Sequence, residues 1–168
     1  MFPFHISQFL LLIFPVFVLI AAILDALTLT IPNRFNLIGM ILFFPIAWLA
    51  GLSLDIILIH MLVGFGLLLL SFAAYAAHIF GGGDSKFIAV IGLWLGYQPL
   101  PEFLLYTSIV GGLLALVVMV GGRWIPTQFQ PAIFQTMYGR KVVPYGTAMS
   151  VAALLAYPNA PLWLILMS

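Results

Sequence analysis

The chain has 168 residues, of which 65% are hydrophobic and 5% are charged. About a quarter of the residues of a soluble globular protein are charged, so this composition excludes a water-soluble fold. It indicates an all-α, polytopic membrane protein, and the length corresponds to a single domain covering residues 1–168. The net charge of +1 identifies no partner, and the absence of cysteine excludes disulfides and thiolate metal sites.

Six apolar stretches approach the length of about 20 residues that a helix needs to cross a bilayer. The first lacks a basic segment before it and a small-residue cleavage site after it, so we expect it to be retained and not removed as a signal peptide. The fourth is short, and we expect it to lie deep in the bundle. The sixth is interrupted at residues 157–161, and its tail either completes the span or folds back. The predicted spans are Ser7 to Leu29, Phe35 to Gly51, Leu54 to Phe80, Asp84 to Tyr97, Phe103 to Val120, and Tyr145 onward with a tail from Leu162 to Met167.

The few charged side chains alternate between the connections of this six-span arrangement. The connections that follow the second and fourth spans hold only Asp55 and Glu102. Because basic residues gather in cytoplasmic loops, we expect the other connections to face the cytoplasm and both termini to face outward. Those connections hold all five basic residues, which are Arg34, Lys86, Arg123, Arg140 and Lys141.

The connection from Gly121 to Tyr145 is the one long loop that the sequence predicts, and it is partly apolar. Four of its side chains fall near one helical face, as expected for a segment in the membrane interface; they are Phe129, Ile133, Phe134 and Met137. Two roles are open. The loop is either an anchor on anionic lipid through Arg140 and Lys141, or an element that docks or gates a substrate.

Two carboxylates lie at the ends of predicted spans. Asp25 falls in the last turns of the first span, and Asp84 opens the fourth after three glycines. The topology places both at similar depth near the cytoplasmic face. Ionisable groups beside hydrocarbon are costly and indicate function, and two adjacent carboxylates share one proton, so that one acts as an acid and the other as a base. The alternative is that Asp84 only caps a helix after a flexible turn.

Three motifs resemble those of type IV prepilin peptidases, which are intramembrane aspartyl proteases. The string Gly81-Gly82-Gly83-Asp84 matches their Gly-x-Gly-Asp signature, and Lys86 follows it as in that family. Asp25 followed by Ile31-Pro32-Asn33, and Lys141-Val142-Val143-Pro144-Tyr145-Gly146, fit the same pattern. The chain is similar to the short, peptidase-only form associated with Flp-type tight-adherence pili. The resemblance implies catalysis by Asp25 and Asp84, with support or substrate contact from Gly81, Gly83, Lys86, Asn33, Tyr145 and Gly146.

The resemblance also implies a function and a location. The expected activity is removal of a prepilin leader, after a glycine, by an enzyme of the bacterial inner membrane whose active site faces the cytoplasm. The expected partners are a membrane-inserted prepilin and lipid, with no cofactor, metal ion or nucleic acid. By the same resemblance, the longer members of the family carry a cysteine-rich cytoplasmic insert and have an N-methyltransferase activity. We expect neither here.

Two other functions fit the same residues. A small proton-coupled transporter or channel would use buried acids as a relay, although a relay usually needs acids at several depths and this chain offers two at one depth. A non-catalytic pilus assembly factor would keep the fold without the chemistry, and the intact acids at both motif positions argue against it. His5, His60 and His78 are scattered, without carboxylates at ligand spacing, and do not suggest a metal site.

Overall fold

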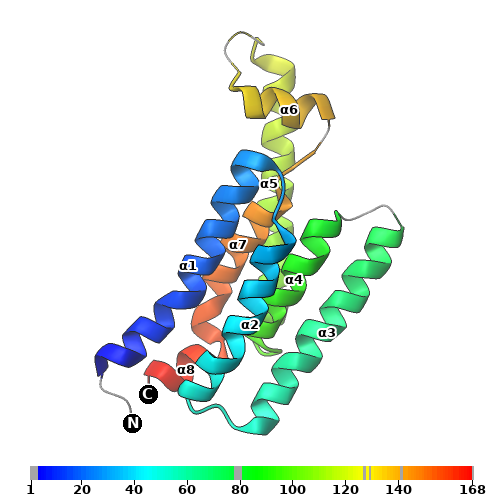
Figure 1. Ribbon diagram of the computed structural model, residues 1–168. Helices are drawn as coiled ribbons and strands as arrows, with labels where there is room; N and C mark the ends of the chain where they lie inside the picture. Colours follow the sequence, from blue (N-terminus) through cyan, green and yellow to red (C-terminus); the bar gives the residue numbers. More distant parts are fainter. Residues whose placement is uncertain (1–3, 78–80, 127, 129, 141, 168) are drawn as a thin grey trace.

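The computed structural model describes residues 4–77, 81–126, 128, 130–140 and 142–167, and within them the chain forms helices and no strand. The all-α prediction is therefore confirmed. Figure 1 shows a bundle of roughly parallel and antiparallel helices, and its elements are α1 (Phe4–Thr28), α2 (Asn33–Leu49), α3 (Leu54–Ala76), α4 (Gly82–Leu95), α5 (Leu100–Trp124), α6 (Ala132–Arg140), α7 (Tyr145–Ala156), the 3₁₀ turn η2 (Tyr157–Asn159) and α8 (Pro161–Met167).

Three of these helices are long and apolar enough to cross a membrane, which confirms a polytopic membrane fold. They are α1 over Phe9–Thr28, α3, and α5 over Leu100–Gly121. Helices α7 and α8 form a pair bent by 49° at the predicted break, a geometry that fits either a broken span or a re-entrant segment. Helix α2 is apolar but shorter, and α4 has 14 residues. The number of six spans stays a prediction.

Helix α4 lies at the centre of the bundle and packs against α2, α3, α7 and α8. Most of its residues are buried, so the expectation that the fourth segment lies deep is confirmed. The indole N–H of Trp94 donates a hydrogen bond to the carbonyl of Gly39 on α2 at 2.9 Å, and its ring stacks on Phe14 of α1 with centroids 5.2 Å apart. A fully buried indole thus satisfies its one donor while joining three helices.

Helices α3 and α4 approach each other closely at two levels. A Cβ on Gly64 would lie 3.1 Å from the carbonyl of Ala89, so the missing side chain permits the contact, whereas Gly66 has nothing within 4 Å of such an atom. Nearer the other end, the hydroxyls of Ser71 and Ser85 each donate to the other residue's carbonyl at 3.0 Å. Small residues and hydroxyl bonds of this kind hold helices together where hydrocarbon offers no hydrophobic drive.

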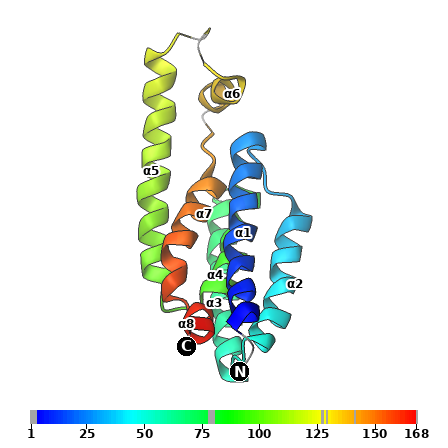
Figure 2. The ribbon, with the colours of Figure 1, turned by 90° about the vertical axis from the view of Figure 1, so that its left-hand side faces the viewer.

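The two ends of the bundle differ in charge. Figures 1 and 2 place the two marked termini at one end, together with the starts of α3 and α5, which carry Asp55 and Glu102. The opposite end holds the starts of α2 and α4 and the end of α5, where Arg34, Lys86 and Arg123 lie. The predicted grouping of charges is present in these residues. Lys141 lies outside the described residues, as does His78.

The predicted interfacial segment is helical as α6, which lies beyond the end of α1 and beside the distal end of α5 in both views (Figures 1 and 2). Phe134 packs against Gly121 of α5, and Met137 is buried. Phe129, which the sequence placed on the same face, lies outside the described residues. The chain continues from α6 into Val142 and Val143, which reach the site described next.

Candidate active site

Asp25 is buried in the last turns of α1, with 3% of its surface exposed. Its Oδ2 accepts a hydrogen bond from the backbone N–H of Thr147 at 2.7 Å, and the Thr147 hydroxyl lies 3.2 Å from both this Oδ2 and the carbonyl of Ala22 and can donate its one proton to either. Thr147 belongs to the first turn of α7, where backbone N–H groups have no partner within the helix and the helix dipole is positive. The start of α7 therefore holds the carboxylate of α1.

Gly146 explains how this contact is possible. A Cβ at position 146 would lie 2.9 Å from Asp25 Cγ and 2.6 Å from Ile31 Cδ1, distances that real side chains do not adopt. Only glycine lets α7 approach the carboxylate this closely. The sequence singled out Gly146 by resemblance alone, and the structure supplies a physical reason for it.

Asp84 lies in the first turn of α4 and is partly buried. The residue at the cap position of this helix is Gly81, and no side chain caps it, so Asp84 does not serve as the N-cap. A Cβ at Gly81 would lie 2.8 Å from Asp84 Oδ2, so that glycine makes room for the carboxylate. A Cβ at Gly83 would lie in ordinary van der Waals contact with backbone atoms of Ile31, at 3.8 and 3.9 Å, so this glycine packs against the Ile31 backbone without crowding it.

Both aspartates line one cavity of about 490 Å³ at the end of the bundle. Its other walls come from residues 29–33, from the glycines 81–83, and from Val142 and Val143. We call this space the aspartate cavity. It unites all three motifs of the sequence, since each contributes to the wall. Its size lies within the range of about 300–1,000 Å³ that is typical of ligand pockets.

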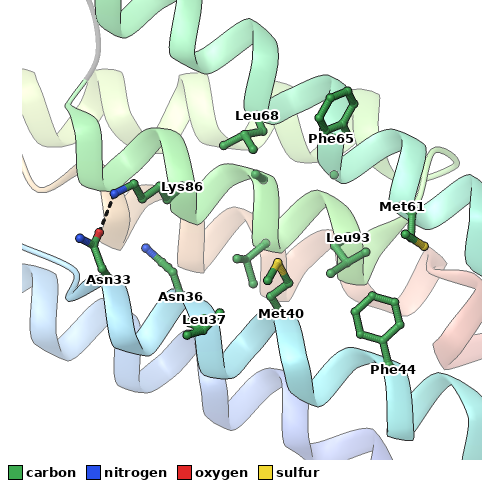
Figure 3. Close-up of a pocket in the computed structure, with 13 residues that line it drawn as sticks. Asn33, Asn36, Leu37, Met40, Phe44, Met61, Phe65, Leu68, Lys86 and Leu93 are labelled. Atoms are coloured by element: carbon green, nitrogen blue, oxygen red, sulfur yellow. Dashed lines mark hydrogen bonds between the residues drawn. The ribbon is translucent and has the colours of Figure 1, made fainter.

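Lys86 and Asn33 form a link between α4 and α2. Lys86 Nζ donates to Asn33 Oδ1 at 2.8 Å, across 53 residues of sequence (Figure 3). The resemblance gave both residues only a general role in support or substrate contact. The observed contact ties the start of the helix that carries Asp84 to the start of α2.

Sequence reasoning missed Thr147 and the lining role of Val142 and Val143. A hydroxyl residue in the first turn of a helix, directly after the motif glycine, was the available signal for Thr147. Tyr145 behaves differently from its neighbour, because its ring lies over Gly111 of α5 and it is not among the residues that line the aspartate cavity. Its expected supporting role stays a prediction.

Fold and site together define a helical membrane protein with two aspartates in one cavity at the basic end of the bundle. Residues 12–116, which contain both aspartates, match the model of the type IV leader peptidase family. The chain belongs to this family.

Curated relatives agree with the family assignment. The chain is 29% identical over 76 residues to a prepilin leader peptidase/N-methyltransferase of Aeromonas hydrophila, and equally to proteins of the same name from Aeromonas salmonicida, one of them from strain A449. The aligned part covers 45% of this chain and 22% of each relative, so it spans about a fifth of their length. No solved structure matches the chain.

Proposed function

We propose that the chain is an intramembrane aspartyl endopeptidase that removes the leader of type IV, Flp-like prepilins at the cytoplasmic face of the bacterial inner membrane. The observation that carries the proposal is the convergence of Asp25 and Asp84 on one cavity. Membership of the type IV leader peptidase family and the printed names of the relatives support the same substrate class.

The chemistry follows from a pair of carboxylates that share one proton. The ionised carboxylate takes a proton from water as the water oxygen attacks the carbonyl carbon of the scissile peptide bond. The protonated carboxyl donates a hydrogen bond to the carbonyl oxygen, where negative charge develops. When the C–N bond breaks, the leaving nitrogen takes a proton from the pair, and two products are released.

The glycines beside Asp84 give a substrate room to approach. An extended peptide needs its backbone near both carboxylates, and the glycines 81–83 line the aspartate cavity without side chains that would fill it. The buried position of Asp25 against Thr147 holds one carboxylate in place while the substrate binds. Fixed positions for reacting groups are a large part of the rate enhancement of an enzyme.

The relay function of a transporter fits this arrangement less well. A relay needs acids at several depths, and among the described acids Asp25 and Asp84 share one end of the bundle while Asp55 and Glu102 begin helices at the other. Glu102 accepts a hydrogen bond from Asn159 at 2.7 Å, which ties α5 to η2 there.

The test is co-expression with an Flp-type prepilin. We expect a mobility shift of the prepilin and, by N-terminal sequencing of the product, a new N-terminus after a glycine. The matched control is the Asp84→Asn variant at equal membrane abundance, which should leave the prepilin uncleaved. An unchanged prepilin with the wild-type chain would refute the proposed activity on that substrate.

A further inference from the structure

A second cavity, of about 380 Å³, lies between α2 and α3 with α4 as its floor (Figure 3). Helices α2 and α3 both pack on α4 and form the two sides of this space. Its lining on α2 recurs every three or four residues, at Asn33, Asn36, Met40 and Phe44. We call this space the α2–α3–α4 groove.

The groove runs along the helices. The eleven-residue separation of Asn33 and Phe44 corresponds to about 16 Å, or about three helical turns. On α3 the lining is shorter and runs from Met61 to Leu68, which corresponds to about 10 Å, or about two helical turns. A groove with lining side chains at helical spacing on its sides fits a helix laid lengthwise, whose side chains at three- and four-residue intervals enter it.

Exposed apolar side chains alone do not mark a binding site in a membrane protein, because lipid covers them. Two other observations distinguish this groove. Asn33 lines both the groove and the aspartate cavity, so the two spaces adjoin at that residue. In addition, Lys86, Asn33 and Asn36 gather at this same end, whereas Phe44 and Met61 lie at the far end (Figure 3).

The buried side chain of Asn36 also points to a ligand. Its side chain is 4% exposed, and neither its amide nitrogen nor its amide oxygen has a hydrogen-bond partner among the described residues. A buried amide without partners is destabilising, and such a group calls for a functional explanation. A peptide group offers the matching donor and acceptor together, whereas a lipid acyl chain offers neither.

We propose that the α2–α3–α4 groove is the docking site for the apolar membrane helix of the protein substrate, and that Asn36 binds the backbone where this helix unwinds toward the aspartate cavity. Side chains on one face of the substrate helix fill the groove, and the flexible Met40 and Met61 adapt to different sequences. Lys86 and Asn33 lie beside Asn36 (Figure 3), and we expect the substrate to displace them as it reaches the Asn36 amide. The proposal rests on the proposed peptidase function and assigns a specificity site to it.

Cross-linking tests the occupant of the groove directly. The chain has no cysteine, so Met40→Cys and Met61→Cys can each be introduced alone, in an Asp84→Asn background that preserves the substrate. The probe is a co-expressed prepilin with one cysteine in its apolar helix. The matched controls are Ile41→Cys and Leu62→Cys, which are exposed neighbours outside the groove.

We expect disulfide-linked enzyme and prepilin at the two groove positions and none above background at the two controls. Equal cross-linking at all four positions would overturn the proposal. Cross-linking between two enzyme copies at Met40, or labelling of the groove only by a photoactivatable lipid, would identify a different occupant and would also overturn it.

Kinetics test the role of Asn36 as a positioning residue. For the membrane-inserted prepilin, Asn36→Leu should raise KM about tenfold, the effect of losing about one or two hydrogen bonds to the substrate, with kcat kept. A purely structural Asn36 would leave KM unchanged. A short junction peptide that ends before the membrane helix lacks the backbone that Asn36 binds, so its KM should change less than that of the prepilin, and a KM effect of equal size on that peptide would contradict docking of the helix.

These measurements separate the two proposals. If the wild-type enzyme cleaves neither the prepilin nor the junction peptide, the proposed function fails. If it cleaves both, Asn36→Leu matches it, and the groove cysteines cross-link no more than their controls, only the docking proposal fails.

Discussion

Asp25 and Asp84 line the same cavity, yet they are held in opposite ways. Asp25 is buried and is fixed by α7, a helix that begins 120 residues later in the chain, through Thr147 and the close approach at Gly146. Asp84 is more open and is positioned by its own helix, with the glycines 81–83 beside it. One carboxylate thus depends on tertiary packing and the other on local backbone, so substitutions around them should have different effects.

The largest effect should come from the acids themselves. Asp25→Asn and Asp84→Asn should each reduce prepilin processing by on the order of 10³-fold or more, and the double variant should be little worse, because residues that act as one unit are not additive. The measurement is processing of a co-expressed prepilin at matched enzyme levels. Substantial processing by either single variant would contradict the shared mechanism.

Gly146→Ala should reduce processing about 100-fold, since its Cβ would displace the Asp25 carboxylate and a misplacement of about 1 Å can cost that much. It should also lower the free energy of unfolding by about 1–3 kcal/mol through overpacking. Processing assays and thermal unfolding in detergent measure the two effects. The control is Gly112→Ala on α5, where a Cβ meets nothing within 4 Å; an equal loss there would show that helix glycines matter generally.

Thr147→Val removes the hydroxyl from Asp25 but keeps the backbone N–H, so it tests how firmly Asp25 must be held. We expect about a tenfold loss of processing efficiency, equivalent to one hydrogen bond to a charged acceptor. Thr147→Ser keeps the hydroxyl and should retain most activity. If the valine and serine variants are equal, the hydroxyl has no part in positioning Asp25.

The smallest effect should come from the link between Lys86 and Asn33 beside Asp84. Lys86→Met should reduce processing about fivefold at most, because an exposed charged contact contributes about 1 kcal/mol or less. Asn33→Leu should have a similar effect, and the double variant should match the single ones, as measured by a double-mutant cycle. Additive losses would show that the two side chains act separately.

The sequence predicted the helical membrane fold because apolar composition and segment length determine it directly. It also indicated that Asp25 and Asp84 lie at one end, since each sits at the edge of an apolar stretch on the same side. Some boundaries were wrong for local reasons. Helix α5 begins at Leu100 and not at Phe103, because Pro101 is compatible with a first turn, and it continues to Trp124 where the prediction ended at Val120.

The contacts that complete the site could not be predicted from local patterns. Thr147 reaches Asp25 across 122 residues, and Lys86 reaches Asn33 across 53, so each depends on which helices become neighbours. The unpartnered amide of Asn36 could not be predicted from the sequence either, because an asparagine near a helix start is an ordinary polar residue there. Such contacts follow from the packing of α2 and α7 around α1 and α4.

The reciprocal bonds of Ser71 and Ser85 bear on how the chain enters the membrane. Helix α4 has 14 residues, which gives it a length of about 21 Å, less than the hydrocarbon core of about 30 Å. Its polar start and short length make it a poor segment for independent insertion. With α3 alongside, each serine hydroxyl meets a carbonyl of the other helix before either faces lipid. We therefore expect α3 and α4 to enter the membrane as one hairpin, in which the longer, more apolar α3 supports the helix that carries Asp84.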